Sequence, residues 1–202
     1  MNKKSSKNFG ELLIVLGDLC IPNRAAKIPE KLEKLLKASN QVKQVLCTGN
    51  LCTRSMEQSL ESLSPIFHLV RGDLDDKKEF PEAPLEKKIR VGAFDIAMIH
   101  GHQIVPWGDV QSLANHKRKL GVDILISGHT HKASVTEIPD GLLLNPGSLT
   151  GSFNAVETKT TPSFMVLSIK NDVCQLYLYE LKEKKVVVST HLYEKKKKSA
   201  SS

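Results

Sequence analysis

Two pairs of histidines, each placed directly after an apolar run, constrain the fold of this chain more than any other feature. Ala97–Ile99 leads into the sequence HGH at 100–102, and Ile124–Ser127 leads into GHTH at 128–131. Both runs have the length and composition of buried strands, so each pair is expected at the carboxyl end of a strand. Ligand sites of α/β sheets form at that edge, and imidazole is a common metal ligand. The pairs therefore indicate a present or former metal site.

The N-terminal third of the chain alternates apolar strands with amphipathic helices. We expect strands over Glu11–Leu16, Gln44–Cys47 and Ile66–Val70, and helices that begin at Pro29 and at Thr53. This β-α-β-α-β order predicts a mainly parallel sheet with helices packed on its faces.

The second half adds further strands and one helix. We expect a helix over Asp109–Leu120 and shorter connections between later strands, which are typical of antiparallel pairing. The strands expected here are Lys88–Val91, Phe94–Ile99, Val122–Ile126, Ser134–Ile138, Leu142–Leu144 and three long strands between Ser163 and Leu192. The predicted fold class is α/β, a two-sheet sandwich flanked by helices.

The charge of the chain is concentrated at its ends. The net charge is +7, but without the seven lysines of the first ten and last eight residues, 22 basic residues balance 22 acidic ones. We therefore expect disordered basic tails at 1–10 and 194–202 around a single domain over 11–193. A folded part that is close to neutral argues against a nucleic-acid partner.

The compartment follows from what the sequence lacks. No apolar run approaches the roughly 20 residues that span a bilayer, and no signal peptide is recognisable. The four cysteines show no C-x-x-C spacing, so we expect free thiols. These features predict a cytoplasmic protein.

Polar side chains end five of the expected strands. They are Asp18, Asn50, Asp73 and His100, with His129 and His131 after the fifth strand. Oxygen and imidazole ligands that converge at one sheet edge suit a pair of divalent ions that activate water and hold a phosphoryl oxygen.

The order of these segments resembles the calcineurin-like metallophosphoesterases, and within them it is similar to the small subunits of the endosomal retromer complex. The resemblance covers about Leu12 to Leu192 and implies a four-layer αββα fold. The stretches that carry it are Gly17–Leu19, Leu46–Thr53, Val70–Asp73, Ile99–Gln103, Pro106–Asp109, Asp123–Lys132 and Asn145–Ser148.

The resemblance implies two sets of metal ligands that share position 50. The first set is Asp18, Cys20, Asn50 and His131, and the second is Asn50, Asp73, His100 and His129. Any ion held there is expected to be zinc or manganese and weakly bound, with a site that holds no metal as the alternative. Ligation by Cys20 and an inert thiol beside a dead site are equally compatible with the sequence.

Four positions depart from the enzyme pattern, one of them being Asp73, which stands where the family has an asparagine. Asn50 replaces the bridging carboxylate, Cys20 replaces a histidine, and Leu74 replaces the histidine that would protonate the leaving oxygen. Asp75, which would orient that histidine, has lost its partner. Because general acid catalysis is typically worth about 10²–10⁴-fold, the sequence predicts that the chain is not an enzyme.

The resemblance instead implies a non-catalytic scaffold of the retromer cargo-selective complex, acting in endosome-to-Golgi and recycling transport. The expected partner is the helical-solenoid subunit, vacuolar protein sorting-associated protein 35, with indirect, peripheral attachment to endosomal membranes. A loop at Ile104, Val105 and Trp107 is the expected contact, Ile104 and Val105 being favoured because Trp107 could equally fold over the sheet as a lid.

A second apolar surface for regulators of the complex is expected from strand alternation, which places Tyr177 and Tyr179 on one face. By resemblance, this face includes Leu35, Val166 and either Val186 or Val188. Two other functions stay open: a weak metal-dependent phosphodiesterase, supported by the retained ligands, and a nucleic-acid module, supported only by the tails.

Overall fold

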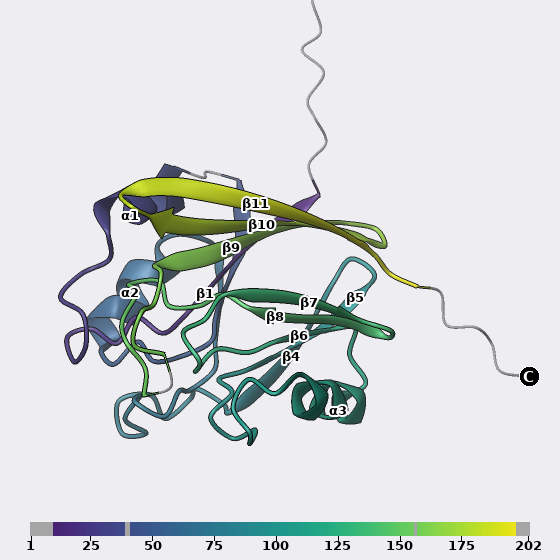
Figure 1. Ribbon diagram of the computed structural model, residues 1–202, viewed down its shortest axis with the longest axis horizontal. Helices are drawn as coiled ribbons and strands as arrows, with labels where there is room; N and C mark the ends of the chain where they lie inside the picture. Colours follow the sequence, from purple (N-terminus) through teal and green to yellow (C-terminus); the bar gives the residue numbers. More distant parts are fainter. Residues whose placement is uncertain (1–9, 39–40, 156, 197–202) are drawn as a thin grey trace, which may run out of the picture.

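Two β-sheets pack face to face in the computed structural model, which describes residues 10–38, 41–155 and 157–196 (Figure 1). One sheet has six strands in the spatial order β11 (Lys185–Glu194), β10 (Val173–Lys182), β9 (Ser163–Lys170), β1 (Glu11–Leu16), β2 (Val42–Cys47) and β3 (Ile66–Leu69). The other has five strands in the order β4 (Glu86–Val91), β5 (Phe94–Ile99), β6 (Ile124–Ile126), β8 (Gly141–Asn145) and β7 (Ser134–Ile138).

Helices cover the outer face of each sheet. The helices α1 (Glu30–Ala38) and α2 (Arg54–Glu61) pack on the six-stranded sheet through Leu32, Leu36 and Leu60. The helix α3 (Val110–Leu120) packs on the five-stranded sheet from the opposite side of the molecule (Figure 1). The predicted four-layer αββα sandwich is therefore confirmed.

Strand alternation divides the apolar side chains between the layers. In β1, Leu13 and Val15 point into the core between the sheets, whereas Ile14 and Leu16 pack beneath α1 and α2. Both faces of β1 are buried, which explains why its sequence is a continuous apolar run.

The parallel strands bring the predicted ligands together. The pairs β1–β2, β2–β3 and β5–β6 are parallel, so the carboxyl ends of the strands within each group face the same way. The loops that follow these strands carry Asp18, Asn50, Asp73, His100 and His129.

The last strand runs one residue beyond the expected domain boundary at 193. Strand β11 continues to Glu194, and Lys195 follows it in a fixed place. The Lys195 ammonium donates to the Ala93 carbonyl oxygen and lies 2.6 Å from Asp123 Oδ2, which fastens the chain to the five-stranded sheet. A lysine run resembles a solvated tail, so this attachment could not be predicted from the sequence. The remaining tail residues, 1–9 and 197–202, lie outside the described residues.

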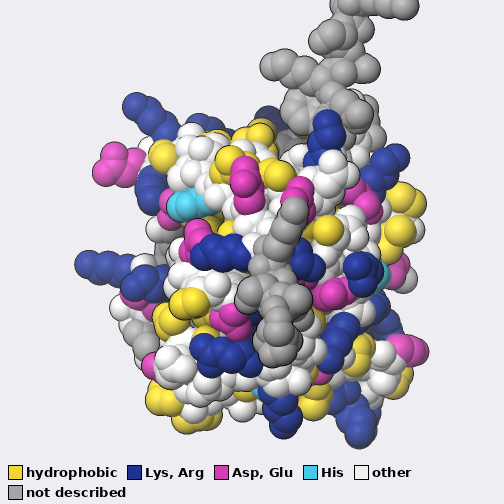
Figure 2. All heavy atoms as spheres, turned by 90° about the vertical axis from the view of Figure 1, so that its right-hand side faces the viewer, with side chains coloured by type: hydrophobic (Ala, Val, Ile, Leu, Met, Phe, Trp, Pro, Cys, Tyr) yellow, Lys and Arg dark blue, Asp and Glu magenta, His cyan; other side chains and the backbone are white. Residues whose placement is uncertain are grey.

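Basic and acidic side chains are interspersed on the face that Figure 2 shows. Of the helices in the described ranges, none is both long enough and apolar enough to cross a bilayer.

Candidate functional site

The backbone at the ligand-bearing loops adopts the left-handed conformation repeatedly. Among the described residues, non-glycine side chains with positive φ gather here: Asp18 (50°), Cys20 (51°), Asn50 (57°), Cys52 (67°), His129 (69°) and His131 (57°). Such backbone is uncommon for non-glycine residues and costs energy. Hydrogen bonds from the Asp18 N–H to the Gly49 carbonyl and from the Cys20 N–H to the Asn50 carbonyl, both 2.9 Å, hold the first two loops together.

A first cluster of potential ligands comprises Asp18, Cys20 and His131, whose ligand atoms lie within 4.8 Å of one another. His131 Nε2 lies 3.3 Å from Asp18 Oδ1, and His131 Nδ1 donates to the Ser152 carbonyl. Burial disfavours the charged form of His131, but the nearby Asp18 carboxylate raises the pKa of this imidazole to about 10. Burial likewise opposes ionisation of Asp18, but His100 and His131 hold its pKa below the ordinary value.

A second cluster comprises Asp73, His100 and His129. His100 Nε2 lies 2.8 Å from Asp73 Oδ1, His129 Nδ1 lies 3.5 Å from the same oxygen, and His100 Nδ1 donates to the Thr48 carbonyl. Burial disfavours the imidazolium form of His100, but Asp18 and Asp73 raise its pKa to about 9. The structure therefore joins all six of the predicted charged or thiol ligands into two adjacent groups.

Asn50 lies between the two clusters, at the predicted bridging position, but it turns its amide nitrogen towards them. Nδ2 lies 3.2 Å from Asp18 Oδ1, 3.1 Å from Asp73 Oδ1 and 3.1 Å from His100 Nε2. The amide oxygen accepts the Leu74 N–H at 2.9 Å. A flipped amide would set its NH2 group against that N–H, so the network fixes the orientation. Asn50 thus supplies hydrogen-bond donors to two carboxylates, where a bridging ligand would supply an oxygen.

The two donor sets fit divalent metals unequally. One carboxylate and two imidazoles in the second cluster suit a transition-metal ion with open positions. The first cluster offers a carboxylate, an imidazole and a thiol, a set that fits zinc better than manganese or magnesium. A bound ion would polarise a phosphoryl oxygen or lower the pKa of a bound water.

No proton donor stands at the position of the expected catalytic histidine, because the half-buried side chain there is Leu74. The neighbouring Asp75 lacks the histidine that it would orient, but its carboxylate has backbone partners instead. Its carboxylate accepts the backbone N–H groups of Asn50 (2.7 Å), Gly72 (2.8 Å) and Cys52 (2.9 Å). Asp75 therefore ties the loops after β2 and β3 together, a role that a residue-type motif does not reveal.

The loop beside the second cluster exposes apolar side chains. Val105 is 74% exposed and Trp107 46%, whereas Ile104 is half-buried and packs against the core beneath α3. The exposed pair is thus Val105 and Trp107, and the expectation that Ile104 accompanies Val105 is only partly met. The Trp107 ring packs edge-on against the His129 ring, with the ring centroids 4.5 Å apart, and Trp107 Nε1 donates to the His102 carbonyl. Trp107 therefore partly covers the second cluster while its own side chain stays accessible to solvent.

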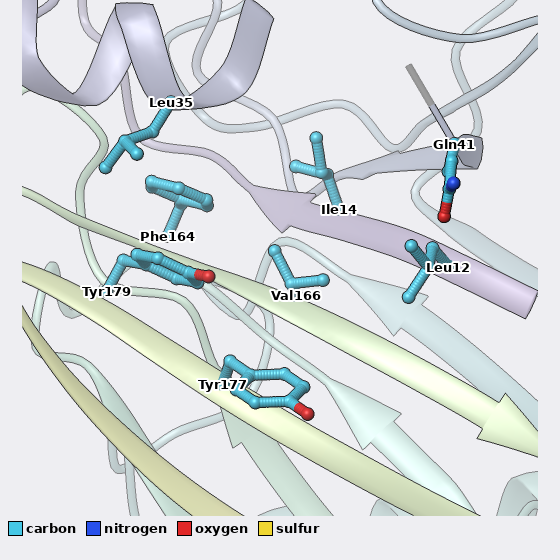
Figure 3. Close-up of a pocket in the computed structure, with 8 residues that line it drawn as sticks. All are labelled: Leu12, Ile14, Leu35, Gln41, Phe164, Val166, Tyr177 and Tyr179. Carbon is cyan, nitrogen blue, oxygen red and sulfur yellow. The ribbon is translucent and has the colours of Figure 1, made fainter. Parts of the chain in front are cut away.

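A second apolar surface lies on the outer face of the six-stranded sheet, beside α1 (Figure 3). It is a groove of about 280 Å³, and all four predicted residues, Leu35, Val166, Tyr177 and Tyr179, line it. Val186 and Val188 do not. The sequence analysis missed the other lining residues, which are Leu12, Ile14, Gln41 and Phe164. Alternation along β1 and β9 could have found three of these, because Leu12 and Ile14 share one face, as do Phe164 and Val166.

Comparisons with known proteins agree with this geometry. Residues 12–172 match the calcineurin-like phosphoesterase superfamily domain. Vacuolar protein sorting-associated protein 29 of Schizosaccharomyces pombe is 36% identical over 188 residues, covering 91% of this chain and 98% of that protein. The chain belongs to the Vps29 family.

Solved Vps29 structures share the fold over nearly their whole length. Vps29 from Cryptosporidium parvum superposes with a TM-score of 0.88 at 36% identity, covering 93% of this chain and 100% of that one. Wild-type Vps29 from Entamoeba histolytica, solved in complex with Zn²⁺, gives a TM-score of 0.84 at 38% identity, covering 90% and 98%. The predicted family and fold are thereby confirmed.

Proposed function

We propose that this Vps29-family chain is a non-catalytic scaffold subunit of the retromer cargo-selective complex, acting in endosome-to-Golgi retrograde and recycling transport. The observation that carries the proposal is the position of exposed Val105 and Trp107 at the rim of a metal centre whose charges the chain balances by itself. Family membership supports the assignment to vacuolar protein sorting.

Two features of the centre argue against efficient phosphoester hydrolysis. Leu74 cannot protonate a leaving oxygen, and the Asn50 amide oxygen is engaged by a backbone N–H. A neutral amide also bridges two dications poorly. The pocket is therefore better suited to be covered by a partner than to turn over substrate.

The proposed partner is the helical-solenoid subunit, vacuolar protein sorting-associated protein 35, and the proposed contact is the loop at Ile104, Val105 and Trp107. Aromatic and aliphatic side chains that protrude from a loop serve as anchors in many protein interfaces. In this arrangement Val105 and Trp107 enter the partner, and the buried part of Ile104 sets the position of the loop. The chain would reach endosomal membranes from the cytoplasm, as a peripheral component of the complex.

Calorimetric titration with the C-terminal half of the solenoid subunit from the same organism tests the proposal. Wild type should bind tightly and Val105→Asp should lose at least about 2 kcal/mol of binding free energy, as for an anchor residue. Val187→Asp on β11, which replaces a valine that is 44% exposed, is the matched control and should bind like wild type. Equal binding by wild type and Val105→Asp would remove the rim from the interface, and no binding by wild type would remove the partner.

We further propose that regulators of the complex use the groove at Leu35, Val166, Tyr177 and Tyr179. Its floor is apolar and includes the Phe164 and Tyr179 rings, which stack with centroids 4.7 Å apart and an interplanar angle of 4° (Figure 3). A peptide with one or two aliphatic side chains fits a groove of this size and chemistry.

A second candidate function, a weak metal-dependent phosphodiesterase, is favoured by the retained ligand clusters. Hydrolysis of bis-(p-nitrophenyl) phosphate with added Mn²⁺ or Zn²⁺ tests it. Turnover that disappears in His100→Ala would establish this activity, whereas equal rates in both proteins would assign the turnover to a contaminant or to free metal.

A further inference from the structure

The strand β11 forms an open edge of the six-stranded sheet. It pairs with β10 on one side, and among the described residues no strand pairs with its other side (Figure 1). At ten residues it is longer than β3, β4 and β7, which are the edge strands elsewhere in the described sheets. A long unpaired edge offers a row of N–H and C=O groups to another strand.

The sequence of β11 lacks the usual protection of a sheet edge. Val187, Val188 and Leu192 are 44%, 45% and 59% exposed. No lysine, arginine, aspartate or glutamate stands between Lys185 and Glu194, whereas three of the six residues of the edge strand β4 are basic. Charged side chains on an edge discourage pairing with another chain. The middle of β11 is therefore suited to pairing with a further strand.

Backbone hydrogen bonds show which residues of β11 turn their polar groups to the open side. The Lys195 N–H donates to the Asp172 carbonyl at 2.8 Å, directly beyond the last pair of the β10–β11 ladder. The direction of these groups alternates along an antiparallel strand. Odd-numbered residues of β11 therefore face β10, and even-numbered residues such as Val188 and Thr190 face outward.

The same strand from a second copy complements this edge when it runs antiparallel. Opposed residues in such a ladder share a face and a hydrogen-bonding direction, so even-numbered residues must meet even-numbered ones. Of the two registers with the longest overlap, one sets Ser189 opposite Ser189 of the second copy and Lys184 opposite Glu194. The other centres on Thr190 and sets lysines before the strand opposite lysines after it, which repel. The charges favour the first register.

We propose that two copies of this chain pair through β11 and form a symmetric dimer with one continuous sheet. The two-fold axis passes beside Ser189, and the exposed apolar side chains of each strand are covered by the other strand. In this register Val186 lies opposite Leu192 of the second copy, and Val187 lies opposite His191. The interface uses neither the rim loop nor the residues that line the groove, so it does not rest on the proposed function.

Sedimentation velocity of the full chain over about 1–500 μM tests whether this dimer forms. Wild type should shift from monomer to dimer mass as its concentration rises. Val188→Pro removes an outward N–H and leaves the ladder to β10 intact, so it should weaken association by about tenfold or more while the circular-dichroism spectrum stays unchanged. A wild type that remains monomeric throughout would overturn the proposal and leave the edge to a strand of another protein. A dimer that folded Val188→Pro leaves unchanged would overturn it as well.

Cysteine trapping tests the register. Ser189→Cys should form an intermolecular disulfide well above the wild-type background, because opposed residues of a non-hydrogen-bonded pair have Cα atoms about 4.5 Å apart. Thr190→Cys is the matched control and should link poorly, since the same residue of the second copy lies two positions along the strand, about 8 Å away. Preferential linking through Thr190→Cys would overturn the register.

A charge swap tests the two ends of the interface. Lys184→Glu and Glu194→Lys should each weaken association about fivefold, because each change acts twice in a symmetric dimer. The double variant should associate within about twofold of wild type, since it restores opposite charges. Single variants without effect, or a double variant as weak as the single ones, would overturn the charge pairing. These measurements use the chain alone, so a failed titration with the solenoid subunit would leave their outcome unchanged.

Discussion

The ligand-bearing edge of the sandwich and the apolar groove beside α1 differ in whether their side chains find partners within the chain. At the edge, Asp18 receives the His129 N–H at 2.8 Å and the Asn50 amide, and its charge is balanced by two imidazoles. In the groove, Leu35 remains 38% exposed, and the Tyr177 and Tyr179 side chains are covered only in part. The polar groups at the edge find their partners within the chain, whereas the groove leaves apolar surface for another molecule.

This difference shows how metal-ligating side chains can also stabilise the fold. Buried charges persist only when each has a partner, and here Asn50 and the histidines provide those partners. The groove carries no such polar network among its described lining residues, so the exposed side chains at its rim can change with little effect on folding. Loss of stability and loss of binding should therefore map to different regions.

Asp18→Asn should have the largest effect on stability. Removal of the charge leaves His100 and His131 without their shared counter-ion and should lower the free energy of unfolding by about 3–5 kcal/mol. Urea denaturation measures this, with Glu61→Gln on the exposed face of α2 as the control. A loss below about 0.5 kcal/mol would show that the edge does not depend on this internal balance.

Phe164→Ala should cause the second-largest loss of stability. The ring is 2% exposed and stacks on Tyr179, and truncation of a buried phenylalanine costs about 3–5 kcal/mol. We expect the lower end of this range, because the groove allows neighbouring side chains to move into the space. The same urea series measures it, and a cost above that of Asp18→Asn would break the proposed ranking of the two regions.

The stability of the metal-free protein should depend on pH because of two histidines at the ligand-bearing edge. Asp18 and Asp73 raise the folded-state pKa of His100 to about 9, and Asp18 raises that of His131 to about 10. Because the folded chain binds these protons more tightly than the unfolded chain, their contribution is complete below about pH 6.5 and is lost as the pH rises through 9 and 10. Thermal unfolding from pH 6.5 to 10 in the presence of a chelator should show a falling midpoint. The fall should be much smaller in Asp18→Asn, and an equal fall would assign it to other groups.

Leu35→Ser should have the smallest effect on folding. The side chain is partly exposed at the groove rim, so the free energy of unfolding should change by about 0.5 kcal/mol or less. Binding of a regulator-derived apolar peptide, measured by fluorescence anisotropy, should nevertheless weaken at least fivefold. Unchanged peptide binding would move the regulator site away from this groove.

Strand order and ligand identity could be predicted because apolar runs that end in glycine and a polar residue are local signals. The direction of the Asn50 amide could not, since it depends on the Leu74 N–H, which only the folded loops bring near. The bracing role of Asp75 depends in the same way on contacts between loops. Composition alone identified the apolar loop at Ile104, Val105 and Trp107. Which of these side chains is exposed depends on packing beneath α3, where Ile104 is half-buried and Val105 is not.

The Asn50 amide also has a consequence for how this protein is made. With an aspartate at position 50, three carboxylates would lie together, and their repulsion would oppose folding unless a cation offset it. The amide removes one of those charges and offers two N–H groups to the others. We therefore expect the chain to reach its folded state in the presence of a chelator.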